Sequence, residues 1–190
     1  MTRIGSPVAP VLWMDQDPKR LARDFDDIQA FAPSLVFQAP REEPQTHGAW
    51  AGPIPRWPFA RPQPEGLDYL LGDQDFEIAM VYPSVYPMTP PLFYPLSLTP
   101  EPEEHSQSRW HVAPDGFLCL LQSTGGWLPE ASPIELIAKA AGWRIEYALM
   151  KTGALSEMTT NGIVSDPQLD GLISTTGLRV RDDRGSDGSE

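Results

Sequence analysis

The chain has 190 residues, 41% of them hydrophobic, and its 26 acidic and 14 basic side chains give a net charge of −12. This length and composition favour one globular domain that buries about 70% of the surface exposed by the unfolded chain. The negative charge opposes binding to nucleic acid, because such binding depends on Lys and Arg side chains that displace counterions. The chain has no stretch of about 18 apolar residues, so we expect no membrane partner and a cytoplasmic location.

A helix is predicted after an N-terminal extension that comprises residues 1–16. Asp17 and Pro18 are typical of an N-cap and of the first position of a helix. The apolar residues that follow recur at helical spacing as far as Ile28. We therefore expect an amphipathic helix here.

Strands are predicted at 35–37, 76–82 and 92–94, and together they favour an antiparallel meander. Within 76–82 every second residue is large and apolar, which is typical of a strand with one buried face. These residues are Phe76, Ile78, Met80 and Tyr82.

Two regions between these elements are predicted to be loops. The first is the proline-rich region 40–64, because proline removes a donor from a strand ladder. Trp50 and Trp57 within it are expected to anchor that loop to the sheet. The second is the polar and charged insert 101–108, which we expect on the surface.

A long helix is predicted to begin near Ser132 and to end at about Lys151. Ser132, Pro133 and Glu135 have the residue types of a capping box that opens a helix. Its apolar residues form one wide stripe, so we expect this helix to pack across the sheet. The stripe consists of Ile134, Leu136, Ile137, Ala138, Ala141, Trp143, Ile145, Tyr147 and Ala148.

The C-terminal segment 161–190 is polar, and only 166–172 is expected to form even a short helix. From about residue 179 the chain has too few apolar residues to offset the entropy lost on ordering. We therefore predict disorder from that point.

Cys119 is the only cysteine, so it cannot form an internal disulfide and is available as a thiol in a reducing compartment. Its thiolate is a good nucleophile and a good leaving group near neutral pH. His111 precedes it by eight residues, and no histidine follows it, which excludes the residue order of papain-like proteases. A lone cysteine is also commonly a buried structural residue.

The surroundings of this cysteine form a specific pattern. A strand leads into a Tyr-Pro-x-x-Pro-Pro turn, a glycine lies three residues before the cysteine, and a Trp-x-Pro begins eight residues after it. The residues that carry the pattern are Tyr86, Pro87, Pro90, Pro91, Gly116, Cys119, Trp127 and Pro129. In this set the chain resembles the ubiquitin-conjugating enzyme family.

The resemblance implies an α+β UBC-like fold over residues 17–160. Its parts are an N-terminal helix, a four-stranded antiparallel meander, a loop that bears the cysteine and a long helix that crosses the sheet. It also implies an enzyme, in which Cys119 forms a thioester with the C-terminus of a ubiquitin-like or analogous protein and passes it to an amine.

The resemblance places His111 where the family has an asparagine that stabilises the oxyanion. An imidazole can donate a hydrogen bond to that oxyanion or accept a proton from the incoming amine. A surface histidine without a catalytic role is the other interpretation.

Asp115 and Gly116 are expected to form a tight turn before the cysteine, and a carboxylate near the thiol can also orient an acceptor amine. Trp127 and Pro129 are expected to pack beneath the active-site loop.

No phosphate-binding loop is recognisable, so we expect activation of the donor carboxylate by a separate enzyme or by cleavage of a peptide bond in a precursor. We expect no cofactor and no metal, since the three histidines and the cysteine lack metal-site spacing.

The histidine at the asparagine position and the short C-terminus are closer to prokaryotic homologues of this family. These are often encoded in antiphage defence operons, including the CBASS type, in which a cyclic-nucleotide synthase is the conjugated partner. The alternative is a UBC-like module that binds a partner without chemistry. The missing asparagine favours this alternative and Cys119 opposes it.

Overall fold

A four-stranded antiparallel sheet forms the centre of the fold in the computed structural model, which describes residues 11–42, 45–122, 126–160, 162–164 and 166–186. The strands are β1 (Val36–Gln38), β2 (Ala49–Pro53), β3 (Glu77–Val81) and β4 (Leu92–Pro95). Each strand pairs with its neighbour in sequence, so their order is β1-β2-β3-β4. The predicted α+β class and the antiparallel meander are confirmed.

Strand β3 shows the alternation that the sequence predicts. Ile78 and Met80 are fully buried, while Glu77, the first residue of the strand, is exposed. Phe76 and Tyr82, which flank the strand, are buried on the same side as Ile78 and Met80. The period of two therefore identified both the strand and its buried face.

Strand β2 lies inside the region that we predicted to be a loop, so that prediction is wrong for 49–53. Trp50 is part of the strand, lies between Phe37 and Met80, and donates from Nε1 to the Tyr82 hydroxyl at 3.1 Å. A side chain at Gly52 would lie 2.7 Å from the carbonyl oxygen of Ser34. Pairing on both edges therefore stabilises a strand whose glycine and proline favour a loop.

Helix α2 (Pro18–Phe31) confirms the predicted N-terminal helix, and the Asp17 side chain accepts a hydrogen bond from the Arg20 amide at 2.9 Å. The predicted N-terminal extension 1–16 contains a short helix, α1 (Trp13–Gln16), in which Trp13 is buried. Residues 1–10 lie outside the described residues.

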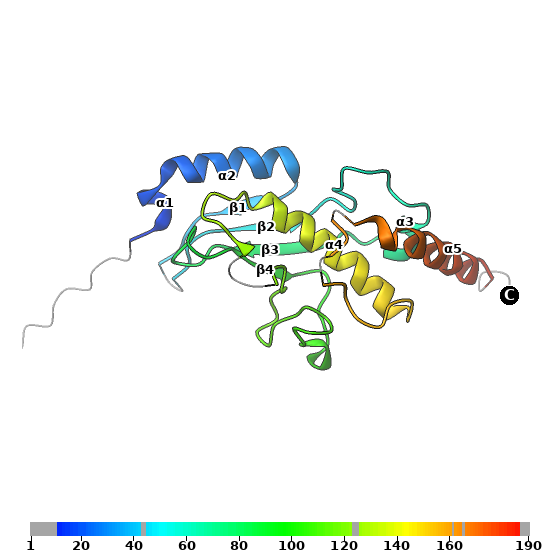
Figure 1. Ribbon diagram of the computed structural model, residues 1–190. Helices are drawn as coiled ribbons and strands as arrows, with labels where there is room; N and C mark the ends of the chain where they lie inside the picture. Colours follow the sequence, from blue (N-terminus) through cyan, green and yellow to red (C-terminus); the bar gives the residue numbers. More distant parts are fainter. Residues whose placement is uncertain (1–10, 43–44, 123–125, 161, 165, 187–190) are drawn as a thin grey trace, which may run out of the picture.

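Helix α4 (Ile134–Lys151) is the predicted long helix, and most of its residues are buried. It begins beside the sheet and runs toward α3 (Leu67–Leu71). Helix α2 lies along the sheet on the side of β1 (Figure 1). The predicted capping box does not form. Pro133 is the N-cap, and the Ser132 hydroxyl donates instead to the Asp27 carboxylate at 2.7 Å.

The C-terminal segment differs most from prediction. A 3-10 turn, η3 (Pro167–Leu169), leads into α5 (Asp170–Ser186), so the disorder predicted from about residue 179 is not seen up to Ser186. Helix α5 packs on α3 (Figure 1), and a side chain at Gly177 would meet the Gly66 carbonyl oxygen at 2.0 Å. Close packing stabilises this helix despite its weak amphipathic pattern.

The predicted surface insert is anchored to α4 and not free. A 3-10 turn, η1 (Pro102–Glu104), carries the buried Glu104. Its carboxylate accepts from the Tyr147 hydroxyl at 2.6 Å and from Lys151 Nζ at 2.8 Å. Burial, and then the hydrogen bond to Glu104, raise the pKa of Tyr147 above its usual value.

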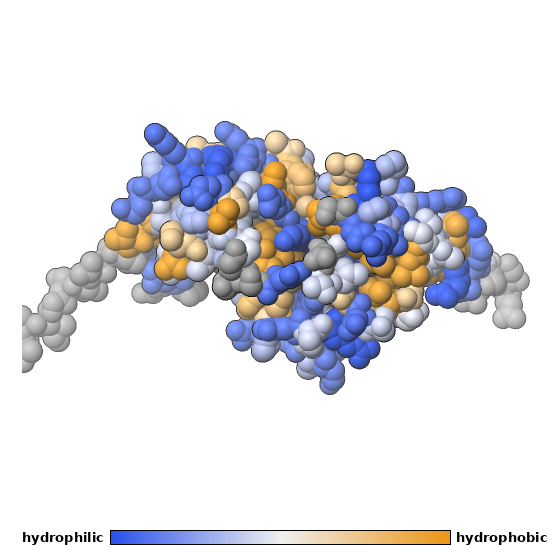
Figure 2. All heavy atoms as spheres, viewed as in Figure 1, coloured by the Kyte–Doolittle hydropathy of each residue, from blue (hydrophilic) through white to orange (hydrophobic). Residues whose placement is uncertain are grey.

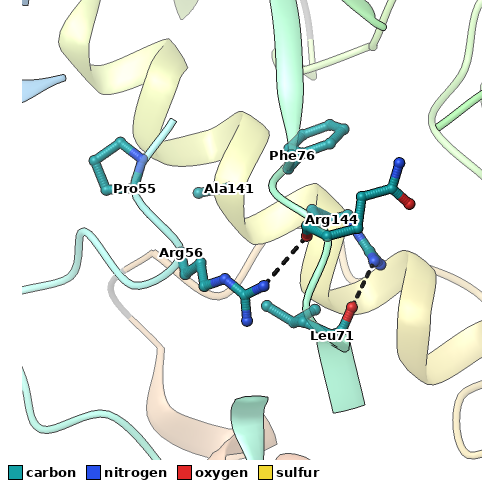
Figure 3. A pocket seen from close by; sticks show the side chains of 7 residues that line it. Pro55, Arg56, Leu71, Phe76, Ala141 and Arg144 are labelled. Atoms are coloured by element: carbon teal, nitrogen blue, oxygen red, sulfur yellow. Dashed lines mark hydrogen bonds between the residues drawn. The ribbon is translucent and has the colours of Figure 1, made fainter. Parts of the chain in front are cut away.

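Two arginines hold the turn that leads from α3 to β3 (Figure 3). Arg56 donates to the Gln74 carbonyl at 3.2 Å, and Arg144 of α4 donates to the Leu71 carbonyl at 3.2 Å. The hollow beside them has a volume of about 10 Å³, which is room for one water molecule. Arg144 therefore satisfies the last carbonyl of α3, and Arg56 holds the turn that follows it.

Within the described ranges, no helix combines the length and the apolar character that crossing a bilayer requires.

Candidate functional site

Residues 111–119 form a tight hairpin between the insert and α4. Val112 pairs with Leu118 in an antiparallel bridge, and the Ala113 amide donates to the Phe117 carbonyl at 2.8 Å. At the open end the Cys119 amide donates to the His111 carbonyl at 2.7 Å. The hairpin therefore places His111 and Cys119 opposite one another, where paired residues have neighbouring side chains.

The tip of the hairpin is the turn predicted at Asp115 and Gly116. The Gly116 amide donates to the Ala113 carbonyl at 2.8 Å, and Gly116 has a φ of 85°. This is a type I turn followed by a left-handed residue, a common hairpin connection. Asp115 is exposed at the end remote from Cys119, about 10 Å away at the rise of a strand. The structure thus does not bring Asp115 to the thiol.

The inner side of the hairpin is fixed to the rest of the molecule. The Leu118 amide donates to the Phe93 carbonyl of β4 at 2.8 Å, and Leu118 itself is buried. His105 of the insert lies with Nδ1 3.1 Å from the Pro114 carbonyl oxygen. This support of the hairpin by the insert was not predicted from the sequence.

Cys119 is a free, half-buried thiol. Burial raises its pKa above the usual value, and burial lowers the pKa of His111. Both shifts favour the neutral imidazole and the neutral thiol, and so disfavour an imidazolium–thiolate pair. The His111 ring makes no hydrogen bond within the described part of the chain, so a reacting group can reach its nitrogens.

The backbone of His111 has a φ of 48°, the one positive value among the described residues other than glycine. Such a conformation is uncommon for a residue with a side chain, and Asn, Asp and His tolerate it best. Non-glycine residues in this region often lie at functional sites.

Cys119 and His111 line a groove of about 970 Å³. Its walls come from the hairpin, from α4, from residues 90–93 and from residues 158–160 with Gly162 and Val164. In the space-filling view, hydrophobic residues reach the surface around the middle of the molecule, between hydrophilic regions (Figure 2). The apolar lining includes Leu118, Leu120, Leu121, Leu136, Trp143 and Met158.

A buried carboxylate holds the far wall of the groove. Glu146 of α4 accepts from the Thr159 amide at 2.6 Å and from the Thr159 hydroxyl at 2.9 Å. Burial raises the pKa of Glu146, and the two hydrogen bonds from Thr159 oppose that shift. The Met158 amide also donates to the Arg109 carbonyl at 3.1 Å, just before the hairpin.

Trp127 and Pro129 lie in the loop that follows residues 123–125, which are outside the described residues. Trp127 is buried and donates from Nε1 to the Pro87 carbonyl at 2.8 Å. Arg20 of α2 donates to the carbonyls of Pro129 and Ala131, the latter at 2.7 Å. These contacts connect the loop to the Tyr86-Pro87 turn and to α2.

Sequence reasoning missed the buried ion pair that organises this region. Arg20 Nε lies 2.8 Å from Asp24 Oδ1, and the Tyr86 hydroxyl donates to Asp24 Oδ2 at 2.5 Å. All three residues are buried. The sequence did contain a sign of this pair. Arg20, Asp24 and Ile28 follow one another at intervals of four residues, so they share one face of α2.

No protein-family model matches the chain, and a search among curated proteins finds no match to its sequence.

Proposed function

We propose that this chain is a UBC-like acyl carrier, in which Cys119 holds the C-terminal carboxyl of another protein as a thioester. The observation that carries the proposal is a free, half-buried thiol opposite His111 on the wall of a groove of about 970 Å³. The order of elements supports it. An N-terminal helix, a four-stranded meander, a cysteine-bearing hairpin and a long helix follow one another as the resemblance implies.

The chemistry consists of two exchanges. The Cys119 sulfur attacks the carbonyl of a donor thioester, so that a new carbon–sulfur bond forms and the donor thiol leaves. An amine then attacks the Cys119 thioester, a carbon–nitrogen bond forms and the Cys119 thiol leaves. His111, neutral near pH 7, can accept the proton of the amine or donate a hydrogen bond to the oxyanion.

We take the donor to be a ubiquitin-like protein or the C-terminus of a cyclic-nucleotide synthase, following the resemblance to antiphage homologues. An exposed apolar surface near the site suits a protein partner. Val85, Met88 and Leu128 are exposed, and the Trp127–Pro87 hydrogen bond brings their two segments together.

The test uses a short peptide thioester of 2-mercaptoethanesulfonate, which needs no activating enzyme. Intact-mass spectrometry should show one acyl adduct that thiol reductant removes. Cys119→Ser should give at most a reductant-stable ester, and Cys119→Ala should give none. Full acylation of Cys119→Ala would refute the proposal.

The second candidate, a binding module without chemistry, is favoured by the raised pKa of Cys119. It predicts that Cys119 exchanges with the thioester no faster than a cysteine in an unstructured peptide. The carrier predicts faster exchange together with transfer to an added amine, and a His111-dependent rate.

A further inference from the structure

One face of α4 forms the wall of the groove opposite the hairpin. Leu136, Lys139, Trp143 and Glu146 line it. Their spacings of three, four and three residues place them on one side of the helix. Lys139 is the one Lys or Arg among the described lining residues, whose other members are mostly apolar or uncharged.

Lys139 makes no ion pair with any residue of the described ranges. Glu146, the one lining carboxylate described, is 2% exposed, and Thr159 occupies both of its oxygens. Glu135, one turn before Lys139, is exposed and not within ion-pair distance of it. Lys139 is therefore a cation without an acidic partner in the lining of the groove that also contains Cys119.

Cys119 lines this groove, so the groove offers a path to a chain joined to the Cys119 sulfur. Apolar walls suit an extended segment with apolar side chains, and an ammonium attracts a carboxylate. A basic segment would place like charges together, which is unfavourable.

We propose that Lys139 is a specificity-determining residue that pairs with an acidic side chain in the extended segment acylated onto Cys119. The inference rests on the proposed function and adds to it the chemical class of the transferred chain. The donor tail is apolar and acidic, and not basic.

Disulfide exchange at Cys119 tests this without acyl transfer. The probes are hexapeptides of leucine and alanine with a C-terminal cysteamine, capped as the mixed disulfide with 2-mercaptoethanol. Cys119 displaces 2-mercaptoethanol, so the peptide becomes bonded to the protein and one thiol is released. A single Glu, Gln or Lys is placed at each position in turn, and intact mass gives the captured fraction.

At one position of the peptide, we expect the Glu peptide to be captured about two- to five-fold more than the Gln peptide, which is the range for a partly exposed ion pair. The Lys peptide should be captured less than the Gln peptide. Lys139→Met should remove the preference and Lys139→Glu should invert it. Adding salt to 0.5 M should weaken it. Lys19→Glu is the matched control, because Lys19 is exposed on α2, and it should behave as wild type.

An unchanged preference in Lys139→Glu would overturn the inference, as would wild-type capture that is the same for Glu, Gln and Lys at every position. If Cys119 captured no peptide in a larger fraction than 2-mercaptoethanol, the groove would not bind an extended chain. Each result is independent of the thioester assay. A charge preference without thioester exchange would therefore refute the proposed function and leave the groove assignment in place.

Discussion

The backbone at His111 explains which residues the site can hold. A φ of 48° costs a residue with a Cβ about 1–2 kcal/mol, and Asn and His suffer least. The resemblance places an asparagine at this spacing, and this chain has a histidine. Asparagine and histidine both tolerate a positive φ, and the side chains of both carry a hydrogen-bond donor.

His111→Gly separates the backbone role of His111 from its proposed catalytic role. Glycine adopts the positive φ freely, so we expect the midpoint of thermal unfolding to stay or rise, while amine transfer slows by about 10–10³ for want of a donor. His111→Asn should restore part of the rate, and His111→Val should lower stability by about 1–2 kcal/mol. A His111→Gly variant with the full rate would assign His111 to structure alone.

Burial governs the reactivity of Cys119. Because burial raises its pKa and neutral His111 gives no compensating charge, the thiol form persists to higher pH than in a free cysteine. The rate of alkylation by iodoacetamide should therefore rise through a midpoint above about 8.5. The urea-unfolded protein should show the ordinary midpoint. A folded midpoint below the unfolded one would mean that His111 is charged and stabilises the thiolate.

Elements with a clear period could be predicted, and elements that depend on distant contacts could not. The alternation across 76–82 and the apolar stripe of α4 survive in the structure because both bury one face. Strand β2 and helix α5 contain glycines, Gly52 and Gly177, whose local preference opposes regular structure. Each of these glycines lies against a carbonyl oxygen of another segment, and sequence alone does not show that contact.

The candidate site could likewise be predicted only in part. The resemblance pointed to Cys119 and His111 through their eight-residue spacing, and the structure places the two residues opposite one another in a hairpin that the sequence did not predict. Sequence reasoning did not identify Lys139 or Glu146, because nothing in the sequence distinguishes them from other charged residues of an amphipathic helix. Asp115 was assigned an optional place near the thiol, but the hairpin holds it at the opposite end.

Substitution of Glu146 tests how α4 holds the far wall of the groove. Its pKa is raised from 4.5 by burial, so the folded state favours the protonated carboxyl. Its contribution to stability is then complete below the unfolded pKa and declines as pH rises through the folded pKa. Glu146→Gln does not titrate and keeps the shape of the side chain.

Relative to wild type, Glu146→Gln should therefore be least stable near pH 4 and should gain stability as pH increases. Chemical denaturation at a series of pH values measures this difference, in which the other titrating groups cancel. A difference that is constant from pH 4 to 8 would show that the Glu146 pKa is ordinary.

At the scale of the whole molecule, the described residues form two hydrophobic clusters that share α4. The first contains the sheet residues with α2 and supports the hairpin and the Trp127 loop. The second lies where α3, α4 and α5 meet and includes Leu67, Leu149 and Ile173. The groove lies along α4 beside the first cluster, so the second cluster acts on the site through the position of that helix.

Removal of residues 166–190 should destabilise the protein, in contrast to the disordered tail that the sequence suggests. Ile173 is fully buried, and its burial contributes about 1.5–3 kcal/mol. Arg61 would also lose its ion pair with Asp170, at 2.9 Å. At about 2–4 °C per kcal/mol for a chain of this size, the unfolding midpoint should fall by about 10 °C. Removal of residues 184–190 alone should leave it unchanged, because Arg184 and Gly185 are exposed. If both truncations melted as the full chain does, α5 would not be docked on α3.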